Sequence, residues 1–287
     1  MKITKILFHT SKCALLAIAI SFSSCKKKNN DTEVSPTTVD LSTEKDLSNA
    51  NNDVNSVLRD VEKTFDDSAN NNLREESTYA TIIRSDVDTA INGTNYKKKT
   101  MITYSETTAD DGQTRSGNIV TYHSGLRENG DLKCYISFSK TKVGGRTISG
   151  SKTIIQKPSS DATKWIFDIS GSGSIATIDG TILNFTTNRT RTRSGINTKP
   201  NITDDTFSVT GSWEGTNAKG ENISATIVSP LLHTYSCKNF REITAGRIDF
   251  NNKTRNVTRT IDYGSGGCDG IGKFIQNGKE YTFFFKR

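Results

Sequence analysis

Two short stretches, Tyr135-Ile136-Ser137-Phe138-Ser139 and Phe207-Ser208-Val209-Thr210, alternate between apolar and polar residues. Successive side chains of a β-strand point to opposite faces of its sheet, so this alternation predicts strands with one buried face and one face in water. A sheet with one wet face is typical of antiparallel pairing, because parallel sheets are covered on both sides. The two stretches therefore predict an all-β, antiparallel domain.

Runs of β-forming residues, separated by turn signals, recur from Tyr79 onward. The turn signals are Glu128-Asn129-Gly130-Asp131, Gly144-Gly145, Asp179-Gly180, Lys219-Gly220 and Asn277-Gly278. The expected strands span residues 99–105, 118–122, 132–139, 147–155, 164–170, 175–186, 207–213, 222–228, 246–250, 257–262, 272–276 and 281–285. Short connections between successive strands predict a β-meander that forms either a sandwich or an open barrel.

A weak internal repeat suggests how this β-rich domain, residues 75–287, is divided. Thr114-Arg115-Ser116-Gly117 recurs as Thr192-Arg193-Ser194-Gly195, and each copy precedes a strand, a turn with glycine and a second strand. We interpret this as two similar halves, residues 75–190 and 191–287.

One segment, within residues 51–72, has helical periodicity instead. Apolar residues recur at helical spacing on one face, and charged residues lie on the opposite face: Val54, Val57, Leu58, Val61 and Phe65 against Asp53, Arg59, Asp60, Glu62 and Lys63. We expect this short amphipathic helix to pack its apolar stripe on the β-rich domain. The alternative is that the stripe binds a partner protein.

The N-terminus predicts export and lipidation. Lys2, Lys5 and Lys12 precede an apolar run at 14–20 that is too short to span a bilayer, and Ser21-Phe22-Ser23-Ser24-Cys25 follows. Small residues before a cysteine are typical of a lipoprotein signal peptide, so we expect residues 1–24 to be removed and Cys25 to be lipidated. Phe22 stands where leucine is usual, and ordinary secretory cleavage is the alternative.

We expect residues 25–50 to form a lipid anchor and a polar, disordered tether. The expected location is the outer membrane, on either its periplasmic or its cell-surface leaflet. The membrane is reached through the lipid on Cys25.

Composition excludes one class of partner. The net charge of +7 falls to +4 after processing, because three of the 38 Lys and Arg residues and none of the 31 Asp and Glu residues lie in the signal peptide. The remaining charges are scattered, whereas nucleic-acid binding requires a clustered basic surface, so we expect no nucleic-acid partner. An apolar content of 32% predicts a thin core.

Three cysteines remain besides Cys25. Export permits disulfides, and we expect Cys237 to pair with Cys268 and Cys134 to stay free in a strand. Three separate thiols are the alternative, since sequence does not fix connectivity.

The order of several motifs resembles that in outer-membrane lipoproteins of the Bacteroidetes whose function is unassigned. The Thr-Arg-Ser-Gly segments are followed by Ser229-Pro230-Leu231-Leu232, then Cys237, then Tyr263-Gly264-Ser265-Gly266-Gly267-Cys268-Asp269. The resemblance covers most of residues 75–287, and the Tyr-Gly-x-Gly-x-Cys-Asp stretch is its most specific part. It implies export, lipidation and an all-β domain, and it carries over no catalytic residue.

Few residues point to catalysis or metal binding. Only His123 and His233 survive processing, and no hydrolase or phosphate-binding motif is present. Asp110-Asp111-Gly112 and Asp204-Asp205 are typical of turns rather than calcium loops, and we expect no metal and no cofactor. A hydrolase of envelope or dietary polysaccharides would need two carboxylates, for which Asp262, Asp269, Glu214 and Glu242 are candidates.

Aromatic residues give the one candidate ligand surface. Trp165 and Trp213, with Tyr104, Tyr122, Tyr135 and Tyr235, either stack on sugars or pack in the core. The expected function is a non-enzymatic binding or assembly module for a glycan or an envelope protein, with the polysaccharide hydrolase as the alternative.

Overall fold

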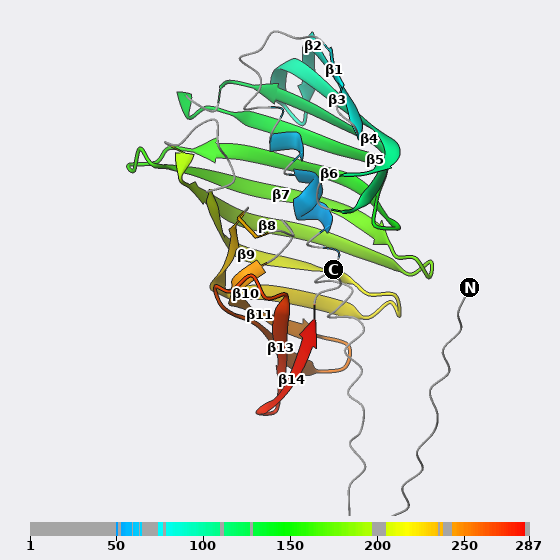
Figure 1. Ribbon diagram of the computed structural model, residues 1–287, viewed down its shortest axis with the longest axis vertical. Coiled ribbons are helices and arrows are strands. Elements are labelled where there is room, and N and C mark those ends of the chain that lie inside the picture. The colour runs from blue at the N-terminus through cyan, green and yellow to red at the C-terminus, as the bar shows by residue number, and fades with distance from the viewer. Residues whose placement is uncertain are drawn as a thin grey trace, which may run out of the picture. The chain divides into compact units, whose positions relative to one another are not determined.

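The structure is a computed structural model that describes residues 50, 53–58, 60–62, 64, 74–76, 79–109, 112–126, 129–196, 205–234, 236–237 and 243–284. The predicted signal peptide, Cys25 and residues 26–49 of the predicted tether lie outside these residues, whereas Ala50, predicted as the end of the tether, is helical and buried. The described part contains one 14-stranded sheet and a short helix at residues 53–58 and 60–62, which precedes the sheet in the chain (Figure 1). No helix among these residues has the length and apolar character needed to cross a membrane.

The strands follow one another across the sheet in chain order, each antiparallel to the next. They are β1 (Arg74–Glu76), β2 (Ala80–Ile91), β3 (Thr94–Thr108), β4 (Thr114–Ser124), β5 (Lys133–Val143), β6 (Arg146–Lys157), β7 (Lys164–Ala176), β8 (Ile182–Ser194), β9 (Thr206–Thr216), β10 (Asn222–Thr234), β11 (Ile243–Asn252), β12 (Val257–Ser265), β13 (Ile271–Gln276) and β14 (Lys279–Phe284).

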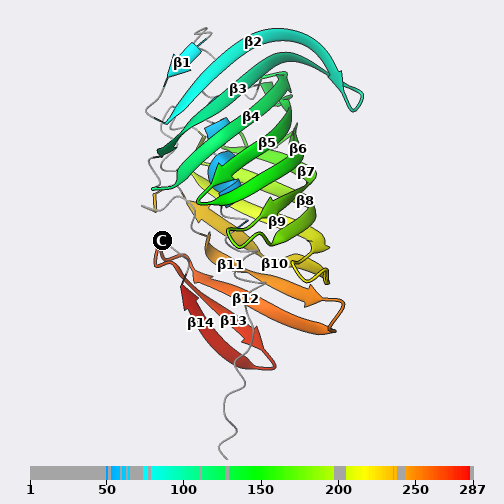
Figure 2. The same ribbon diagram turned by 90° about the vertical axis from the view of Figure 1, so that its right-hand side faces the viewer.

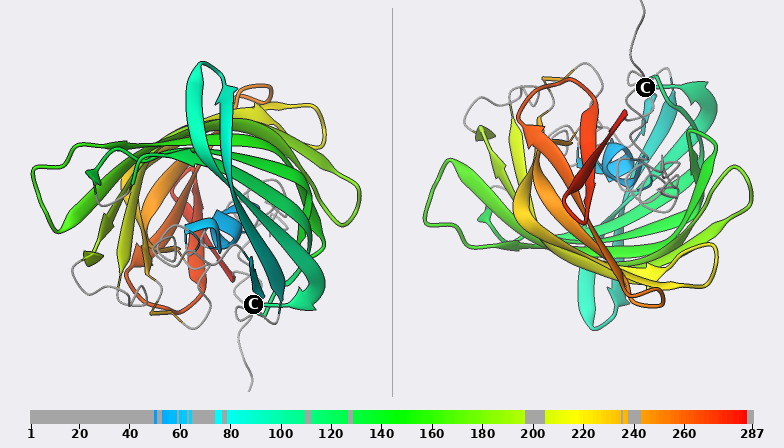
Figure 3. Two further views of the ribbon diagram at one scale, coloured as in Figure 1. Left: turned by 90° about the horizontal axis from the view of Figure 1, so that it is seen from above. Right: turned by 90° about the horizontal axis from the view of Figure 1, so that it is seen from below.

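The sheet curls around the helix and leaves β1 and β14 unjoined, as Figures 2 and 3 show. The predicted all-β meander with one short N-terminal helix is confirmed, in the open-barrel form. The boundary expected between two similar halves, at residues 190–191, falls inside β8, and the sheet continues through it.

One predicted strand is wrong. Residues 175–186 form two strands, because the chain turns between Ala176 and Ile182. In this turn the backbone N–H of Thr177 donates to the carbonyl of Thr181 at 2.8 Å, and Gly180 has a positive φ of 83°. The Asp-Gly turn signal therefore outweighs the β propensity of the isoleucines beside it.

Two long strands differ from the prediction, one because it was not predicted and one because it is longer than predicted. β2 was not expected, and β8 continues to Ser194 through Arg189, Arg191 and Arg193. These arginines alternate with polar residues, so the usual contrast between apolar and polar positions is absent there.

The apolar core lies on the concave face of the sheet. Alternate residues of each strand are buried there, as in β7, where Trp165, Phe167, Ile169 and Ile175 are inside. The helix adds Val54, Val57, Leu58 and Val61 of its apolar stripe to the same cluster, whereas Phe65 lies outside the described residues. Among the described residues, the core is formed by the concave face of the sheet together with the helix.

Three acidic residues of the predicted charged face are also buried, while Arg59 and Lys63 lie outside the described residues. Asp53, Asp60 and Glu62 are only 2%, 5% and 7% exposed. Asp53 pairs with Arg146 of β6 at 2.8 Å, Asp60 with Arg115 of β4 at 3.3 Å, and Glu62 with Arg191 of β8. The helix is thus held by three ion pairs as well as by apolar contacts.

The pair between Asp60 and Arg115 is the most enclosed of the three. Arg115 has no exposed surface, and the hydroxyl of Tyr104 donates to Asp60 at 2.9 Å. Burial raises the pKa of Tyr104 well above its usual value, and the charge of Asp60 adds to the rise. Tyr104 therefore stays protonated and able to donate this hydrogen bond.

A disulfide joins Cys237, after β10, to Cys268, after β12. The predicted pairing is confirmed, and Cys134 is buried in β5 and takes no part in a disulfide, as expected. The bond closes a loop of 31 residues that contains β11 and β12.

We predict that Asp60→Ala lowers the free energy of unfolding by about 3–5 kcal/mol, because Arg115 loses the carboxylate that neutralises it in the interior. Urea denaturation would measure the loss. The matched control is Asp86→Ala, since Asp86 pairs with Lys98 on the surface, where both side chains are mostly exposed. The urea midpoint of this control variant should hardly differ from that of the wild type. Equal losses for the two variants would contradict a central role for the buried pair.

We predict that Cys268→Ser lowers stability by about 3–4 kcal/mol, because the unfolded chain regains the freedom that the 31-residue loop removes. Reductant should lower the urea midpoint of the wild type to that of the variant. Reductant should leave the urea midpoint of the variant unchanged. A wild-type urea midpoint that does not change when reductant is added would contradict the prediction.

Candidate functional site

The predicted aromatic candidates lie mostly inside. Trp165 and Trp213 are each 8% exposed and belong to the concave core. Arg193 lies over the ring of Trp165 at 5.2 Å, and Trp213 meets Phe250 edge-on, with ring centroids 5.3 Å apart. Both indoles therefore contact core residues and do not form a flat outer surface.

The tyrosine candidates are separated from the tryptophans. Tyr104 is buried, whereas Tyr122 and Tyr135 face each other across β4 and β5 and are half-buried. Tyr235 lies outside the described residues. No single aromatic platform forms among the candidates that the structure describes.

The predicted carboxylate candidates have separate partners. Asp262 pairs with Arg247 at 2.8 Å, Glu214 is 3.6 Å from Lys253, and Asp269 accepts a hydrogen bond from the backbone of Ile271. Glu242 lies outside the described residues. Of the other acidic candidates, Asp205 pairs with Arg193 in the interior, and Asp110, Asp111 and Asp204 lie outside the described part. Across the described ranges, no group of three or more potential ligands is placed to hold a metal ion.

A shallow groove of about 590 Å³, which we call the amide groove, lies over β7 to β10. Its lining combines polar and apolar surface, and its polar residues are Ser172, Asn184, Thr186, Glu214, Thr216, Asn222 and Lys253, beside Gly173, Phe185, Gly215 and Ile223. These polar residues follow from the sheet register. Ser172, Thr186 and Glu214 are opposite one another on three adjacent strands, and Asn184, Thr216 and Asn222 form the next such row.

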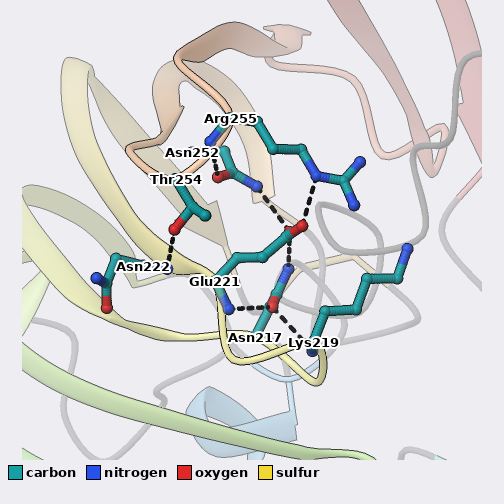
Figure 4. A network of polar contacts seen from close by, with 7 residues as sticks. All are labelled: Asn217, Lys219, Glu221, Asn222, Asn252, Thr254 and Arg255. Atoms are coloured by element: carbon teal, nitrogen blue, oxygen red, sulfur yellow. Dashed lines mark hydrogen bonds and ion pairs between the residues drawn. The ribbon is translucent and has the colours of Figure 1, made fainter.

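Two neighbouring turns hold one side of the amide groove in place (Figure 4). The carboxylate of Glu221 accepts hydrogen bonds from Asn217 at 2.7 Å, Asn252 at 2.9 Å and Arg255 at 2.5 Å. The backbone N–H of Asn222 donates to the hydroxyl of Thr254 at 2.9 Å. These bonds link the β9–β10 turn to the β11–β12 turn, which carries Lys253.

The charge of Glu221 is fixed by this network. The hydrogen bond from Asn217 is the largest cause of a lowered pKa, and Asn252 and Arg255 add to it. Glu221 is therefore a carboxylate at neutral pH and serves as the acceptor that joins the two turns.

A second feature, which the sequence reading missed, is a buried lysine on the concave face. Lys152 of β6 is 7% exposed and has no hydrogen-bond or ion-pair partner among the described residues. Burial lowers its pKa to about 7, and the charges of Arg189 and Arg191 contribute. Its position in alternation with the inward residues Ile148 and Ile154 is a sequence signal that could have identified it.

His233 of β10 lies in the same interior environment. Burial lowers its pKa to about 3, and Arg191 and Arg189 contribute. His233 is therefore neutral at physiological pH. His123 is on β4, six strands away in the sheet order, so the two histidines are not neighbours in the sheet.

The two sheet edges are the remaining candidates for contact with a protein partner. The edge formed by β1 and the outer part of β2 carries charged side chains. β1 pairs with β2 only at residues 81–83, and the outer part of β2 carries Asp86 and Asp88, which pair with Lys98 and Lys97 of β3. Charged side chains of this kind discourage pairing between exposed strand edges.

Comparison with family models, curated proteins and solved structures finds no match for this chain.

We predict that Lys152→Met raises the free energy of unfolding by about 1–4 kcal/mol at pH 6, because an apolar side chain of similar length replaces a buried cation. The gain should shrink as the pH rises from 7 towards 10.5, since over that range the folded wild type has lost the Lys152 proton and the unfolded chain still holds it. Urea denaturation at several pH values would measure the difference. Lys98→Met, at an exposed site, is the control, and a less stable Lys152→Met variant would contradict the prediction.

Proposed function

We propose that this protein is a non-enzymatic glycan-binding module of the cell envelope, anchored in the outer membrane by a lipid on Cys25. The observation that carries the proposal is the amide groove, whose polar side chains come from adjacent strands and face one hollow. Its volume of about 590 Å³ lies within the range of small-molecule sites, roughly 300–1,000 Å³.

The side chains of the groove suit the chemistry of a sugar. Each sugar hydroxyl both donates and accepts hydrogen bonds. The amides of Asn184 and Asn222 can do both, Glu214 accepts and Lys253 donates. A uniformly charged or uniformly apolar groove would lack this mixture.

Rigidity of the groove also supports a binding role. Lys253 donates its backbone N–H to the carbonyl of Asn222 at 2.9 Å, and the network around Glu221 holds both turns. Binding to side chains that are already positioned costs less conformational entropy than binding to mobile ones.

The distribution of carboxylates favours binding over hydrolysis. A glycosidase places two carboxylates on opposite sides of the bond, roughly 5–10 Å apart, and one of them has a raised pKa. Among the described residues that line the groove, Glu214 is the single carboxylate. Glu221, on the adjacent turn, has a lowered pKa and accepts hydrogen bonds from three side chains. A general acid must instead hold a proton, so Glu221 is unsuited to that role.

The envelope location in this proposal comes from the sequence. The lysine-bearing N-terminus, the apolar run at 14–20 and the small residues before Cys25 support lipidation. The order of motifs around Cys237 and Cys268, similar to that of Bacteroidetes outer-membrane lipoproteins, supports the same location.

We predict that the double variant Asn184→Ala, Glu214→Ala binds its polysaccharide at least tenfold more weakly than wild type, because several hydrogen bonds of about 1 kcal/mol each are lost. The measurement is calorimetry of the purified chain against a panel of envelope and dietary polysaccharides, with reducing ends assayed for each hit. Asp168→Asn is the control, since Asp168 lies on β7 outside the groove and pairs with Lys157 on the surface.

New reducing ends would contradict the non-enzymatic role, and equal binding by the double variant would exclude the amide groove as the site. A panel without any hit would contradict the glycan proposal and direct attention to a protein partner. Substitution of Trp213 is unsuitable for this test, because its indole is part of the core.

A further inference from the structure

A small pocket lies between the helix and the concave face of the sheet, apart from the amide groove, although Phe185 lines both. We call it the Lys152 pocket. Ala50 and Val54 form its helix side, and its sheet side comes from β6 to β9. The view along the trough in Figure 3 shows the helix inside the curve of these strands. The cavity volume is about 50 Å³.

The pocket has one cationic end and one apolar end, which follows from the register. Lys152, Gly171, Thr187 and Trp213 form one row across β6, β7, β8 and β9. Along β8 the inward residues run from Leu183 and Phe185, through Thr187, to Arg189. Lys152 and Arg189 thus line one part of the pocket, while Ile175, Leu183 and Phe185 line the other.

Gly171 keeps space open beside Lys152. A Cβ atom at this position would lie 2.9 Å from Cγ of Lys152 and 2.4 Å from the carbonyl oxygen of Ser151. A side chain here would therefore clash with the backbone of β6 as well as with the stem of Lys152. The absence of a side chain at residue 171 lets β6 and Lys152 lie this close to β7.

The ammonium of Lys152 lacks a neutralising group in the described structure. The carboxylates described on this face already have arginine partners: Asp53 with Arg146, Asp60 with Arg115, Glu62 with Arg191 and Asp205 with Arg193. The charged groups that act on Lys152 are Arg189 and Arg191, both cations. A cation in such surroundings is costly, and a bound anion would remove much of that cost.

The lining and size define which anion fits. Six of the nine lining residues are apolar, which disfavours a free inorganic anion that needs hydrogen bonds on all sides. A volume of about 50 Å³ holds about four water-sized groups. A carboxylate with a few carbon atoms meets both limits, whereas a long acyl chain exceeds them.

We propose that the Lys152 pocket binds a short-chain monocarboxylate, with the carboxylate on the ammonium of Lys152 and the alkyl chain against Ile175, Leu183 and Phe185. Arg189 adds positive charge at the carboxylate end. This inference is independent of glycan binding at the amide groove, since it rests on buried residues of the concave face.

The test is calorimetry of the purified full chain at pH 6 with four probes: butyrate, 1-butanol, inorganic phosphate and octanoate. Butyrate should bind saturably. Butanol, which lacks the anion, phosphate, which lacks the alkyl chain, and octanoate, which is too long, should each bind at least tenfold more weakly. Equal binding of butanol would overturn the role of the anion, and equal binding of phosphate or octanoate would overturn the role of the pocket's lining and size.

Variants locate the site. Lys152→Met should weaken butyrate binding at least tenfold while melting no lower than wild type, which separates lost binding from lost folding. Lys98→Met and the groove variant Asn184→Ala, Glu214→Ala should bind butyrate as wild type does. Unchanged binding by Lys152→Met, or no butyrate binding by the wild type, would overturn the proposal and leave the pocket as a site for water alone.

Discussion

Three ion pairs between the helix and the concave face of the sheet organise this fold. Asp53, Asp60 and Glu62 are removed from water, and each meets an arginine that is likewise enclosed by the sheet. Neither the carboxylates nor the arginines can be buried alone, because an isolated charge in the interior is far more costly than a paired one. The ion pairs therefore couple the position of the helix to β4, β6 and β8.

An open meander needs such an arrangement. A curled sheet that does not close leaves its concave face uncovered, and a face lined with isoleucine, phenylalanine and tryptophan must meet something other than water. In the described structure the helix supplies part of that cover. Polar residues predominate on the convex face, although Ile155 and Ile182 are exposed there. The two faces therefore differ in chemistry: hydrogen-bonding groups gather in the amide groove outside, and cations gather inside beside apolar residues.

Lys152 and the groove illustrate two ways in which a sheet can hold a ligand. In the groove, neighbouring strands place polar side chains in register, and the turn network around Glu221 fixes them. On the concave face, burial alone favours the binding of an anion, since Lys152 is separated from water and lies near other cations. The polar residues of the groove cost the fold little stability. The buried Lys152 lowers the stability of the fold, and a bound anion would restore that stability.

The sequence by itself determined the elements whose causes are local. Alternation in stretches such as residues 135–139 gave the strands, Asp179-Gly180 marked a turn, and the spacing of Val54, Val57 and Val61 gave the helix. The disulfide between Cys237 and Cys268 was also foreseen. Only the tertiary structure decided which charges are buried. Glu62 and Arg191 are 129 residues apart, and Tyr104 and Asp60 are 44 apart. A charged residue looks exposed until its distant partner is known, because its burial is possible only where folding brings an opposite charge to it.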